Sequence, residues 1–269
     1  MYEGFYGLSA KCFSKTPDPA FLYHSKNHAE ALARLQYAVE EREFVLLTGE
    51  IGSGKTTLSR ALIDSLDESY RPVLIINPRL SPAQFLRTLA RKLGVQGPKF
   101  FKNDLLEQIN ERLYLFHEEE VCPVVIIDEA QLIPGKDTFE EIRLLTNYQL
   151  DDMNLLALVL IGQTELRDRL RRPAYQALRQ RIGMVFHLVP LDEPETGEYL
   201  RHRLKIAGRE EPLFDTGAAQ AIFKYSRGIP RIINTIATGS LLSGLGAGSD
   251  IVSSGIIEDV VQDLGLKET

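Results

Sequence analysis

The sequence predicts an α/β fold in which a parallel sheet of five strands is followed by an all-helical region. Five short apolar runs alternate with segments whose apolar residues have helical spacing, which is typical of a parallel sheet covered by helices. A glycine-rich loop follows the first of these runs directly. After Pro190, helical segments follow one another without a strand pattern between them. We therefore expect an N-terminal arm over residues 1–25, a sheet domain over 26–190 and a helical domain over 191–269.

The individual elements follow from local patterns. The expected strands are Phe44–Thr48, Val73–Asn77, Val124–Glu129, Leu155–Ile161 and Met184–Leu188. In the sheet domain, one helix is expected to begin after the capping residue Ser25, one to follow the glycine-rich loop, and two to span roughly 82–93 and 103–118. The helices expected after Pro190 are Glu195–Ala207, Asp215–Tyr225, Arg231–Leu242 and Ser254–Leu264.

The composition is that of an ordinary globular protein. Of the 269 residues, 44% are hydrophobic and 25% are charged, and the net charge of −6 disfavours extensive coating of nucleic acid while allowing local basic patches. Cys12 and Cys122 have no metal-binding or redox spacing, which favours a reducing compartment. The sequence shows no signal-peptide pattern and no apolar run long enough to span a bilayer. We therefore expect a cytoplasmic protein without a transmembrane segment.

The first apolar run leads into a loop that matches the pattern G-x-x-x-x-G-K-[ST] at residues 49–56. The flanking strand and helix patterns disfavour a chance match to a glycine-rich turn. Backbone N–H groups of such a loop bind phosphate oxygens, aided by the partial positive charge of the helix N-terminus. Lys55 is expected to reach the β- and γ-phosphates, and the Thr56 hydroxyl to bind Mg²⁺. The predicted ATP-binding residues are Gly49, Glu50, Ile51, Gly52, Ser53, Gly54, Lys55, Thr56 and Thr57.

The third apolar run ends in Asp128-Glu129. Next to a phosphate-binding loop, Asp128 is expected to hold the Mg²⁺ shell and Glu129 to orient and polarise the attacking water. The alternative is a strand that ends in two solvated acids. We expect these acids to come from the strand next to the one that precedes the loop, so that they lie close to Lys55.

Three further polar residues are candidates for the same chemistry. Gln163 follows the fourth run, where it would reach the γ-phosphate or its water, or merely form a turn. Arg181 precedes the fifth run and is expected to reach the nucleotide of a neighbouring subunit, with ordinary surface charge as the alternative. Arg231, in Gly-Ile-Pro-Arg, begins a helix and either reaches the γ-phosphate or has no ligand role. Which arginine acts between subunits stays open among Arg167, Arg169, Arg171, Arg172, Arg179 and Arg181.

The arm and a basic stretch each allow two interpretations. The arm is rich in aromatic residues and proline, and its rings either pack onto the sheet domain or partly cover the adenine of the nucleotide. These residues are Tyr2, Phe5, Tyr6, Phe13, Pro17, Pro19, Phe21 and Tyr23. Between residues 79 and 102 there is no acidic residue but six basic ones, Arg79, Arg87, Arg91, Lys92, Lys99 and Lys102. This stretch is either a solvated surface or a contact for nucleic acid or another polyanion, with Arg79, Lys99 and Lys102 as the candidate contacts.

Taken in order, these motifs resemble those of AAA+ ATPases, and more closely those of the ExeA-like (general secretion pathway protein A) family. The matching segments are Met1–Leu8, Pro17–Tyr23 with Ser25, His28, Glu30 and Ala31, Leu47–Thr57, Ile127–Gln131, Ile161–Leu166, Gln180–Ile182 and Gly228–Asn234. The resemblance covers essentially the whole chain and implies a P-loop NTPase fold of the AAA+ type with a helical lid. It also implies roles for single residues: Lys55 and Thr56 as Walker A, Asp128 and Glu129 as Walker B, Gln163 as sensor 1, Arg181 as arginine finger and Arg231 as sensor 2.

The resemblance further implies a homo-oligomer, either a ring or a filament. The secretion proteins continue from such a part into a membrane span and a periplasmic peptidoglycan-binding region, which this sequence lacks, so we expect no direct cell-wall role. The same compact AAA+ core is similar to transposition-regulator ATPases of the TnsC, TniB and MuB group, which assemble on DNA.

Three functions therefore stay open. The first is an ATPase that hydrolyses ATP at subunit interfaces to drive assembly or remodelling. The second is an ATP-gated regulator that binds duplex DNA, and the third is a partner of an inner-membrane secretion or pilus-assembly protein. A small-molecule kinase would leave the arginine series and the Gly-Ile-Pro-Arg segment unexplained. The missing Asn-Lys-x-Asp motif disfavours a GTPase.

Overall fold

The computed structural model describes residues 1–14, 18–150 and 153–266. The chain forms two compact units. One, here called the sheet unit, comprises Glu30–Gly49 and Leu58–Leu188, and the other, the helical unit, comprises Met1–Ala29, Glu50–Thr57 and Val189–Thr269. The phosphate-binding loop thus groups with the helices, although the strand before it belongs to the sheet unit. Pro17, one of the prolines noted in the arm, lies outside the described residues.

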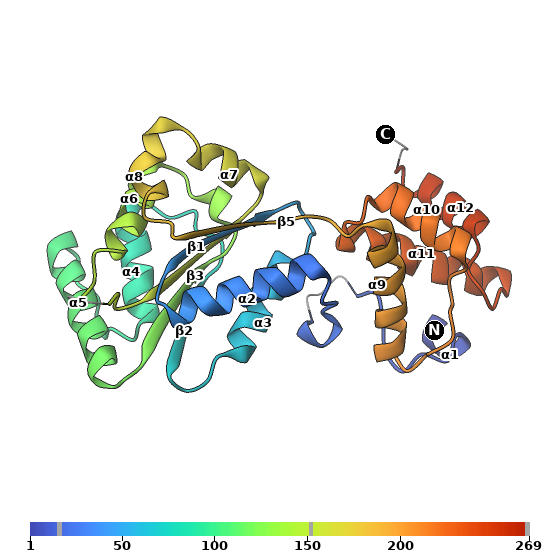
Figure 1. Ribbon diagram of the computed structural model, residues 1–269, viewed down its shortest axis with the longest axis horizontal. Coiled ribbons are helices and arrows are strands. Elements are labelled where there is room, and N and C mark those ends of the chain that lie inside the picture. The colour runs from blue at the N-terminus through green and yellow to red at the C-terminus, as the bar shows by residue number, and fades with distance from the viewer. Residues whose placement is uncertain (15–17, 151–152, 267–269) are drawn as a thin grey trace. The chain divides into compact units, whose positions relative to one another are not determined.

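The sheet has five parallel strands, as the sequence predicts (Figure 1). They are β1 (Phe44–Gly49), β2 (Tyr70–Ile75), β3 (Cys122–Ile127), β4 (Ala157–Gly162) and β5 (Met184–Leu188). Every residue of β1, β3 and β4 is buried, because the sheet is covered on both faces, and this explains why the three strands read as continuous apolar runs.

The strand order corrects one expectation. The order is β2-β3-β4-β1-β5, so β4 lies between β1 and the strand that carries the acidic pair. Asp128 and Glu129 therefore do not come from the strand next to the loop-bearing strand. Both residues also lie beyond β3, which ends at Ile127, and not within it.

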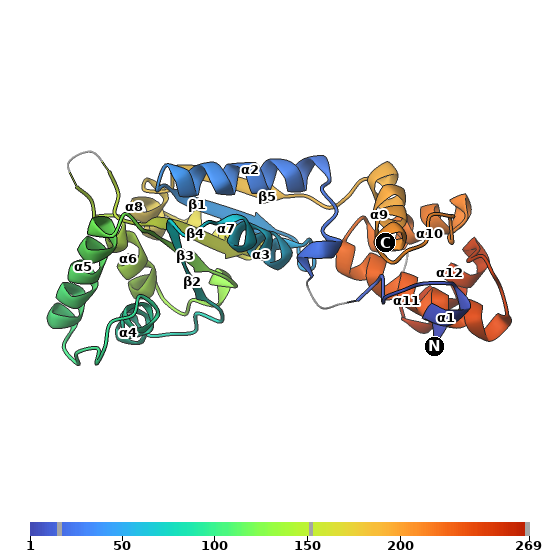
Figure 2. The same cartoon turned by 90° about the horizontal axis from the view of Figure 1, so that it is seen from below.

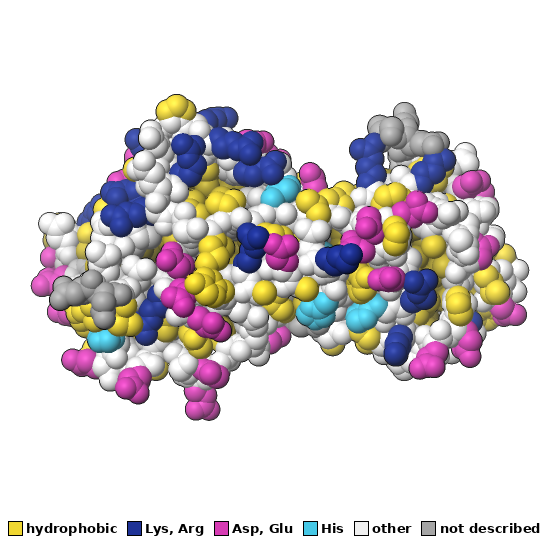
Figure 3. Space-filling view, viewed as in Figure 1, with side chains coloured by type: hydrophobic (Ala, Val, Ile, Leu, Met, Phe, Trp, Pro, Cys, Tyr) yellow, Lys and Arg dark blue, Asp and Glu magenta, His cyan; other side chains and the backbone are white. Residues whose placement is uncertain are grey.

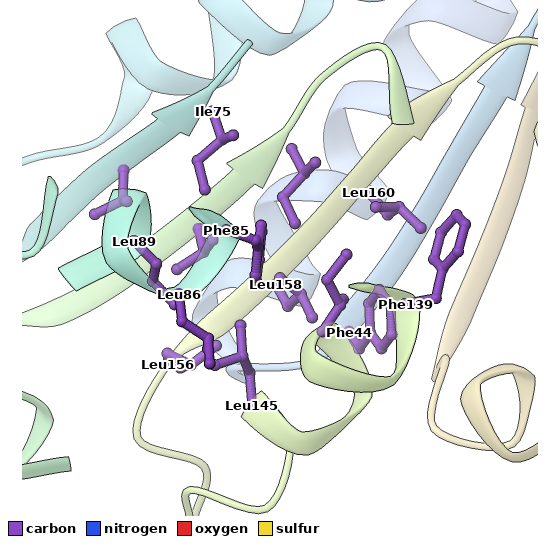
Figure 4. Close-up of a cluster of buried hydrophobic side chains, with 14 of the residues drawn as sticks. Phe44, Ile75, Phe85, Leu86, Leu89, Phe139, Leu145, Leu156, Leu158 and Leu160 are labelled. Atoms are coloured by element: carbon purple, nitrogen blue, oxygen red, sulfur yellow. The ribbon is translucent and has the colours of Figure 1, made fainter. Parts of the chain in front are cut away.

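Helices α4, α5 and α6 cover one face of the sheet, and α2 lies against the opposite face (Figure 2). The core on the first face joins Phe44, Ile75 and Leu158 of the strands to Phe85 of α4 and Phe139 of α6 (Figure 4). The helices that lie wholly or largely in the sheet unit are α2 (Lys26–Glu40), α3 (Lys55–Ser65), α4 (Pro82–Lys92), α5 (Lys102–Glu118), α6 (Lys136–Leu145), α7 (Thr164–Leu170) and α8 (Gln176–Arg179), with short 3-10 helices η2 (Ala130–Leu132) and η3 (Pro173–Tyr175).

Helices α6, α7 and α8 were not predicted from the sequence. Helix α6 buries a face made of Phe139, Ile142 and Leu145 among other residues, but it is only ten residues long, and so short a pattern does not stand out from the flanking segments. Helices α7 and α8 are seven and four residues long, below the length at which periodicity is informative.

The helical unit contains the four predicted helices. They are α9 (Glu193–Ile206), α10 (Thr216–Ser226), α11 (Pro230–Ala247) and α12 (Ser254–Asp263). Helix α9 begins with a capping box in which the Asp192 carboxylate accepts from the Glu195 N–H and the Glu195 carboxylate accepts from the Asp192 N–H. Asp215 caps α10 in a similar way by accepting from the Ala218 N–H. Among the residues that the structure describes, no helix has both the length and the apolarity to cross a membrane.

The N-terminal arm packs on these helices. It holds the short helix α1 (Tyr2–Phe5) and a 3-10 turn, η1 (Pro19–Phe21). Tyr2, Tyr6 and Phe13 are buried in the core of the helical unit. Their predicted packing onto the sheet domain is therefore wrong, because the apolar faces of α9 to α12 provide the surface that they cover.

Candidate nucleotide-binding site

The parallel sheet brings several predicted site residues to one edge. Because all five strands run in the same direction, their carboxyl ends share an edge of the sheet. Gly49 ends β1 and leads into the phosphate-binding loop, Asp128 and Glu129 follow β3, and Gln163 follows β4. In open α/β sheets this edge is where ligands bind.

The loop between β1 and α3 has positive backbone φ angles at two of its glycines. Gly52 and Gly54 have φ of +83° and +103°, a region that side-chain-bearing residues rarely adopt. Lys55 is the first residue of α3, and its Nζ donates to the Glu50 carbonyl at 2.8 Å, so its buried side chain folds back over the loop. Ser53 is fully buried. The loop N–H groups thus precede a helix N-terminus, the arrangement that binds phosphate.

Arg231 lies against this loop. Its N–H donates to the Gly52 carbonyl at 3.2 Å, and a Cβ atom on Gly52 would lie only 2.6 Å from the Arg231 Cβ. The turn before Arg231 requires Gly228, whose φ is +73° and where a Cβ atom would lie 1.7 Å from the Leu191 carbonyl oxygen. The Gly-Ile-Pro-Arg segment is therefore built to place Arg231 beside the loop, although its guanidinium role stays a prediction.

His28, from the N-terminal part of the chain, also contacts the loop. In the sequence, this histidine stands out only as part of the resemblance to the ExeA-like family. Its Nε2 lies 2.9 Å from the Ser53 carbonyl oxygen, and its Nδ1 lies 2.8 Å from the Ser25 hydroxyl. The Ser25 Oγ also accepts from the His28 N–H at 3.2 Å, which confirms the predicted cap of α2. Burial lowers the pKa of His28, while its hydrogen bond to the Ser53 carbonyl and the charge of Glu195 act in the opposite direction.

In the sheet unit, Glu129 and Gln163 lie in contact. Glu129 follows β3 with φ of +55°, in the left-handed region. Its Oε2 accepts from Gln163 Nε2 at 3.2 Å and from Gln131 Nε2 at 2.5 Å. Gln131 Oε1 in turn accepts from the Gln163 N–H at 3.1 Å. The carboxylate is therefore held by two amides, one of which, Gln131, the sequence analysis did not single out as a site residue. Its position two residues after Glu129 on a short turn was the only local signal.

Asp128 is almost fully buried, and its Oδ1 accepts from the Glu129 N–H at 2.8 Å. The predicted magnesium ligands, the Asp128 carboxylate and the Thr56 hydroxyl, are hard oxygen donors of the kind that Mg²⁺ prefers. Mg²⁺ in such sites takes one or two protein ligands and completes its shell with phosphate and water oxygens. The residues present therefore fit this ion.

The arginines of residues 167–181 differ in their contacts. Arg169 Nη1 donates to the Ile133 carbonyl and its Nε to the Tyr175 hydroxyl, and Arg179 donates to the Arg171 carbonyl. Arg181 is exposed, and its Nη2 donates to Asn147 Oδ1 at 3.1 Å. Figure 3 shows that Lys and Arg side chains gather over the α7 and α8 part of the sheet unit. Arg169 and Arg179 therefore support the local fold. Arg181 is a better candidate than either for the arginine that acts between subunits.

Arg181 also stands at the sheet edge opposite the one where β1 ends. It precedes β5, whose first residue Met184 pairs with Val45 near the start of β1. With Arg42, Gln180 and other residues it lines a cavity of about 270 Å³ at this amino-terminal edge. Gly49, which leads into the loop, ends the same strand at the other edge.

The basic stretch is partly engaged within the chain. Lys102 Nζ lies 2.6 Å from Oε1 of Glu141, a carboxylate whose side chain is only 7% exposed. The Arg87 guanidinium lies 5.6 Å from the centre of the Phe100 ring. Arg79 and Lys99 are exposed. Lys102 therefore compensates a buried acid, whereas the other two predicted contacts face solvent.

Comparisons with known proteins agree with this fold. Residues 38–170 match the family model described as an AAA domain. General secretion pathway protein A of Aeromonas hydrophila is 40% identical over 260 residues, which cover 96% of this chain and 47% of that protein. The chain thus spans about half the length of this curated relative. The RuvB subunit of the Holliday junction branch migration complex of Fervidobacterium nodosum is 26% identical, with 93% of this chain and 67% of that protein covered.

Among solved structures, the crystal structure of Cdc6p from Pyrobaculum aerophilum superposes with a TM-score of 0.72 at 18% identity, covering 94% of this chain and 70% of that one. At this identity the likeness shows the fold alone. Together with the parallel sheet and the phosphate-binding loop, these matches confirm the predicted P-loop NTPase fold and the resemblance to the secretion protein. The chain contains an AAA domain on a P-loop NTPase fold and is a homologue of general secretion pathway protein A.

Proposed function

We propose that this protein binds ATP and hydrolyses it to ADP and phosphate. The observation that carries the proposal is the loop at residues 49–56, with Gly52 and Gly54 in left-handed conformations and Lys55 folded back over it at the start of α3. Such a loop holds the phosphates of a nucleotide through backbone N–H groups. In this proposal residues 49–57 bind ATP, and Arg231 lies beside the phosphates.

Hydrolysis would use the polar residues at the carboxyl edge of the sheet. Thr56 and Asp128 would hold Mg²⁺, which neutralises charge on the phosphates when it is bound. Glu129 would accept a proton from the attacking water, and Gln163 would keep the carboxylate and the water aligned. The hydrogen bond from Gln163 to Glu129 supports this division of roles.

We further propose that ATP is hydrolysed at the interface between two copies of the chain, in a ring or a filament. Arg181 supports this, because it stands at the sheet edge opposite the one where β1 ends. An arginine at that edge would serve the nucleotide of a neighbouring copy. The division of the chain at residues 25/26 and 190/191 into arm, nucleotide-binding domain and lid remains part of this proposal.

Steady-state phosphate release tests the proposal. We expect Mg²⁺-dependent release by the wild type that rises with protein concentration. Glu129→Gln should lower it by about 10²-fold or more while ATP still binds, and Arg181→Ala should abolish it unless a copy with an intact Arg181 is added. Absence of wild-type release at high protein concentration, with and without duplex DNA, would contradict hydrolysis.

A second candidate is an ATP-gated DNA-binding regulator, related in kind to the TnsC, TniB and MuB group. The run of six basic residues between positions 79 and 102 with no acidic residue favours it, and RuvB is named as a subunit of a Holliday junction branch migration complex. The test is retention of duplex DNA by ATP-loaded protein, which should fall steeply with salt. Arg79→Ala and Lys99→Ala should weaken it, whereas Lys205→Ala, an exposed lysine on α9, is the matched control.

A third candidate function is binding of an inner-membrane protein of a secretion or pilus-assembly system. The name of the homologous protein, general secretion pathway protein A, favours it. Under this proposal the chain acts at the cytoplasmic side. Cell fractionation with a tagged full chain tests it. Recovery only in the cytoplasmic fraction, with no membrane protein cross-linked to it, would contradict this role.

A further inference from the structure

We propose that His28 is a positioning residue that fixes the orientation of the Ser53–Gly54 peptide and thereby aims the Gly54 N–H at the bound phosphate. This inference rests on the proposed function, in which the loop binds a triphosphate. It adds to the loop a residue of the N-terminal segment, more than twenty positions earlier in the chain.

The contact is short and enclosed. His28 is 3% exposed, and its Nε2 lies 2.9 Å from the Ser53 carbonyl oxygen. A Cβ atom on Gly54 would lie 2.9 Å from the same nitrogen. The imidazole therefore abuts the Ser53–Gly54 peptide itself and leaves no room for a side chain at position 54.

Peptide geometry connects this contact to phosphate binding. In a planar trans peptide the C=O and the following N–H point in opposite directions. A hydrogen bond that holds the Ser53 carbonyl toward His28 thus turns the Gly54 N–H away from it. Since glycine rotates freely on both sides of zero φ, the peptide before Gly54 would otherwise reorient at little cost. A flipped peptide would present a carbonyl oxygen to the phosphate in place of an N–H.

The tautomer that this role requires is held by Ser25. A carbonyl only accepts, so Nε2 must carry the proton, and the neutral ring then accepts at Nδ1. The Ser25 hydroxyl, 2.8 Å from Nδ1, can donate there. Ser25 is buried and also caps α2, so both the ring and its partner are fixed in place.

The segment that carries His28 is itself fastened to α9. The Tyr23 hydroxyl donates to the Glu198 carboxylate at 2.5 Å, and the Lys26 N–H donates to Glu195 at 3.3 Å. The N–H of Arg231 donates to the Gly52 carbonyl of the same loop. Two consecutive parts of the loop are therefore held by hydrogen bonds from different segments of the helical unit.

Equilibrium titration of the full chain with a fluorescent ATP analogue and Mg²⁺ tests the role of His28, with thermal unfolding of the nucleotide-free protein measured in parallel. We expect His28→Phe to raise Kd about tenfold, the effect of losing one hydrogen bond to a buried carbonyl. His28→Gln, whose amide can donate from nearly the position of Nε2, should bind within about twofold of wild type. His24→Phe, an exposed histidine on the same segment, is the matched control and should bind like wild type.

The outcomes separate positioning from simple support of the fold. A lower unfolding temperature with unchanged Kd in His28→Phe, or equal weakening in the Gln and Phe variants, overturns the proposal. Should His28→Phe not fold, His28→Asn carries a polar donor that is too short to reach Ser53, and wild-type affinity in that variant also overturns it. Failure of the wild type to bind the analogue is a different result, because it refutes the proposed function itself.

Discussion

The phosphate-binding loop and the Glu129 carboxylate are held by different parts of the molecule. The loop takes its side contacts from the helical unit, through His28 and Arg231. Glu129 takes its contacts from the sheet unit, through Gln131 and Gln163. If the proposed function holds, ATP binding and hydrolysis depend on separate hydrogen-bond networks, and single substitutions should affect one without the other.

Glu129→Gln should show the largest effect. Removing the carboxylate that is proposed to accept the proton of the attacking water should lower kcat by about 10²-fold or more, because general-base catalysis contributes on that order. The Kd for ATP should change little, since the amides that hold the Glu129 carboxylate, those of Gln131 and Gln163, belong to the sheet unit. Phosphate release and equilibrium binding measure the two quantities. A Kd that rises as much as kcat falls would show that the networks are not separate.

Gly228→Ala should have the next largest effect, on the helical side. The Cβ atom would lie 1.7 Å from the Leu191 carbonyl oxygen, at a φ of +73°. We expect a loss of about 2–4 kcal/mol in the free energy of unfolding, together with weaker ATP binding. The matched control is Gly246→Ala on α11, where a Cβ atom meets nothing within 4 Å and helix propensity predicts a gain of about 0.5–1 kcal/mol. Equal stability of the two variants in urea unfolding would contradict this account.

Gln131→Ala tests the hydrogen-bond network around Glu129 in the sheet unit. It removes one of the two amides that hold the Glu129 Oε2 and the acceptor of the Gln163 N–H. We expect kcat to fall by about tenfold while the Kd for ATP stays unchanged. The Glu129 carboxylate would be less well aligned with the water, but no contact to ATP would be lost. Single-turnover kinetics isolates the chemical step. An effect confined to Kd would place Gln131 in the binding network instead.

The smallest expected effect is on stability at low pH. Burial lowers the pKa of both His28 and His202, so the folded state binds fewer protons than the unfolded state. The stability contributed by the neutral rings is present above the ordinary histidine pKa of about 6.5 and is lost as the pH falls through and below it. We expect the free energy of unfolding to decrease from pH 7 to pH 5, and His28→Gln to flatten part of that slope. An unchanged slope in the variant would show that His28 is not one of the groups responsible.

Much of the fold could be predicted because its signals are local. The strand that ends at Gly49 and the one that ends before Asp128 are buried on every residue, and a sheet covered on both faces favours the short apolar runs that they form. Helix α9 was expected because its apolar residues repeat at helical spacing. Helices α7 and α8 lack this information, since fewer than eight residues hardly define a period.

The class of fold, the phosphate-binding loop and the acidic pair could be predicted from the sequence, because spacing along the chain controls each of them. The folded chain was needed to see that β4 separates β1 from β3, that His28 holds the Ser53 carbonyl, and that Gln131 joins Gln163 on Glu129. Strand order and hydrogen bonds between distant residues follow from packing of the whole chain. No period or motif encodes them, because they depend on which surfaces meet after folding.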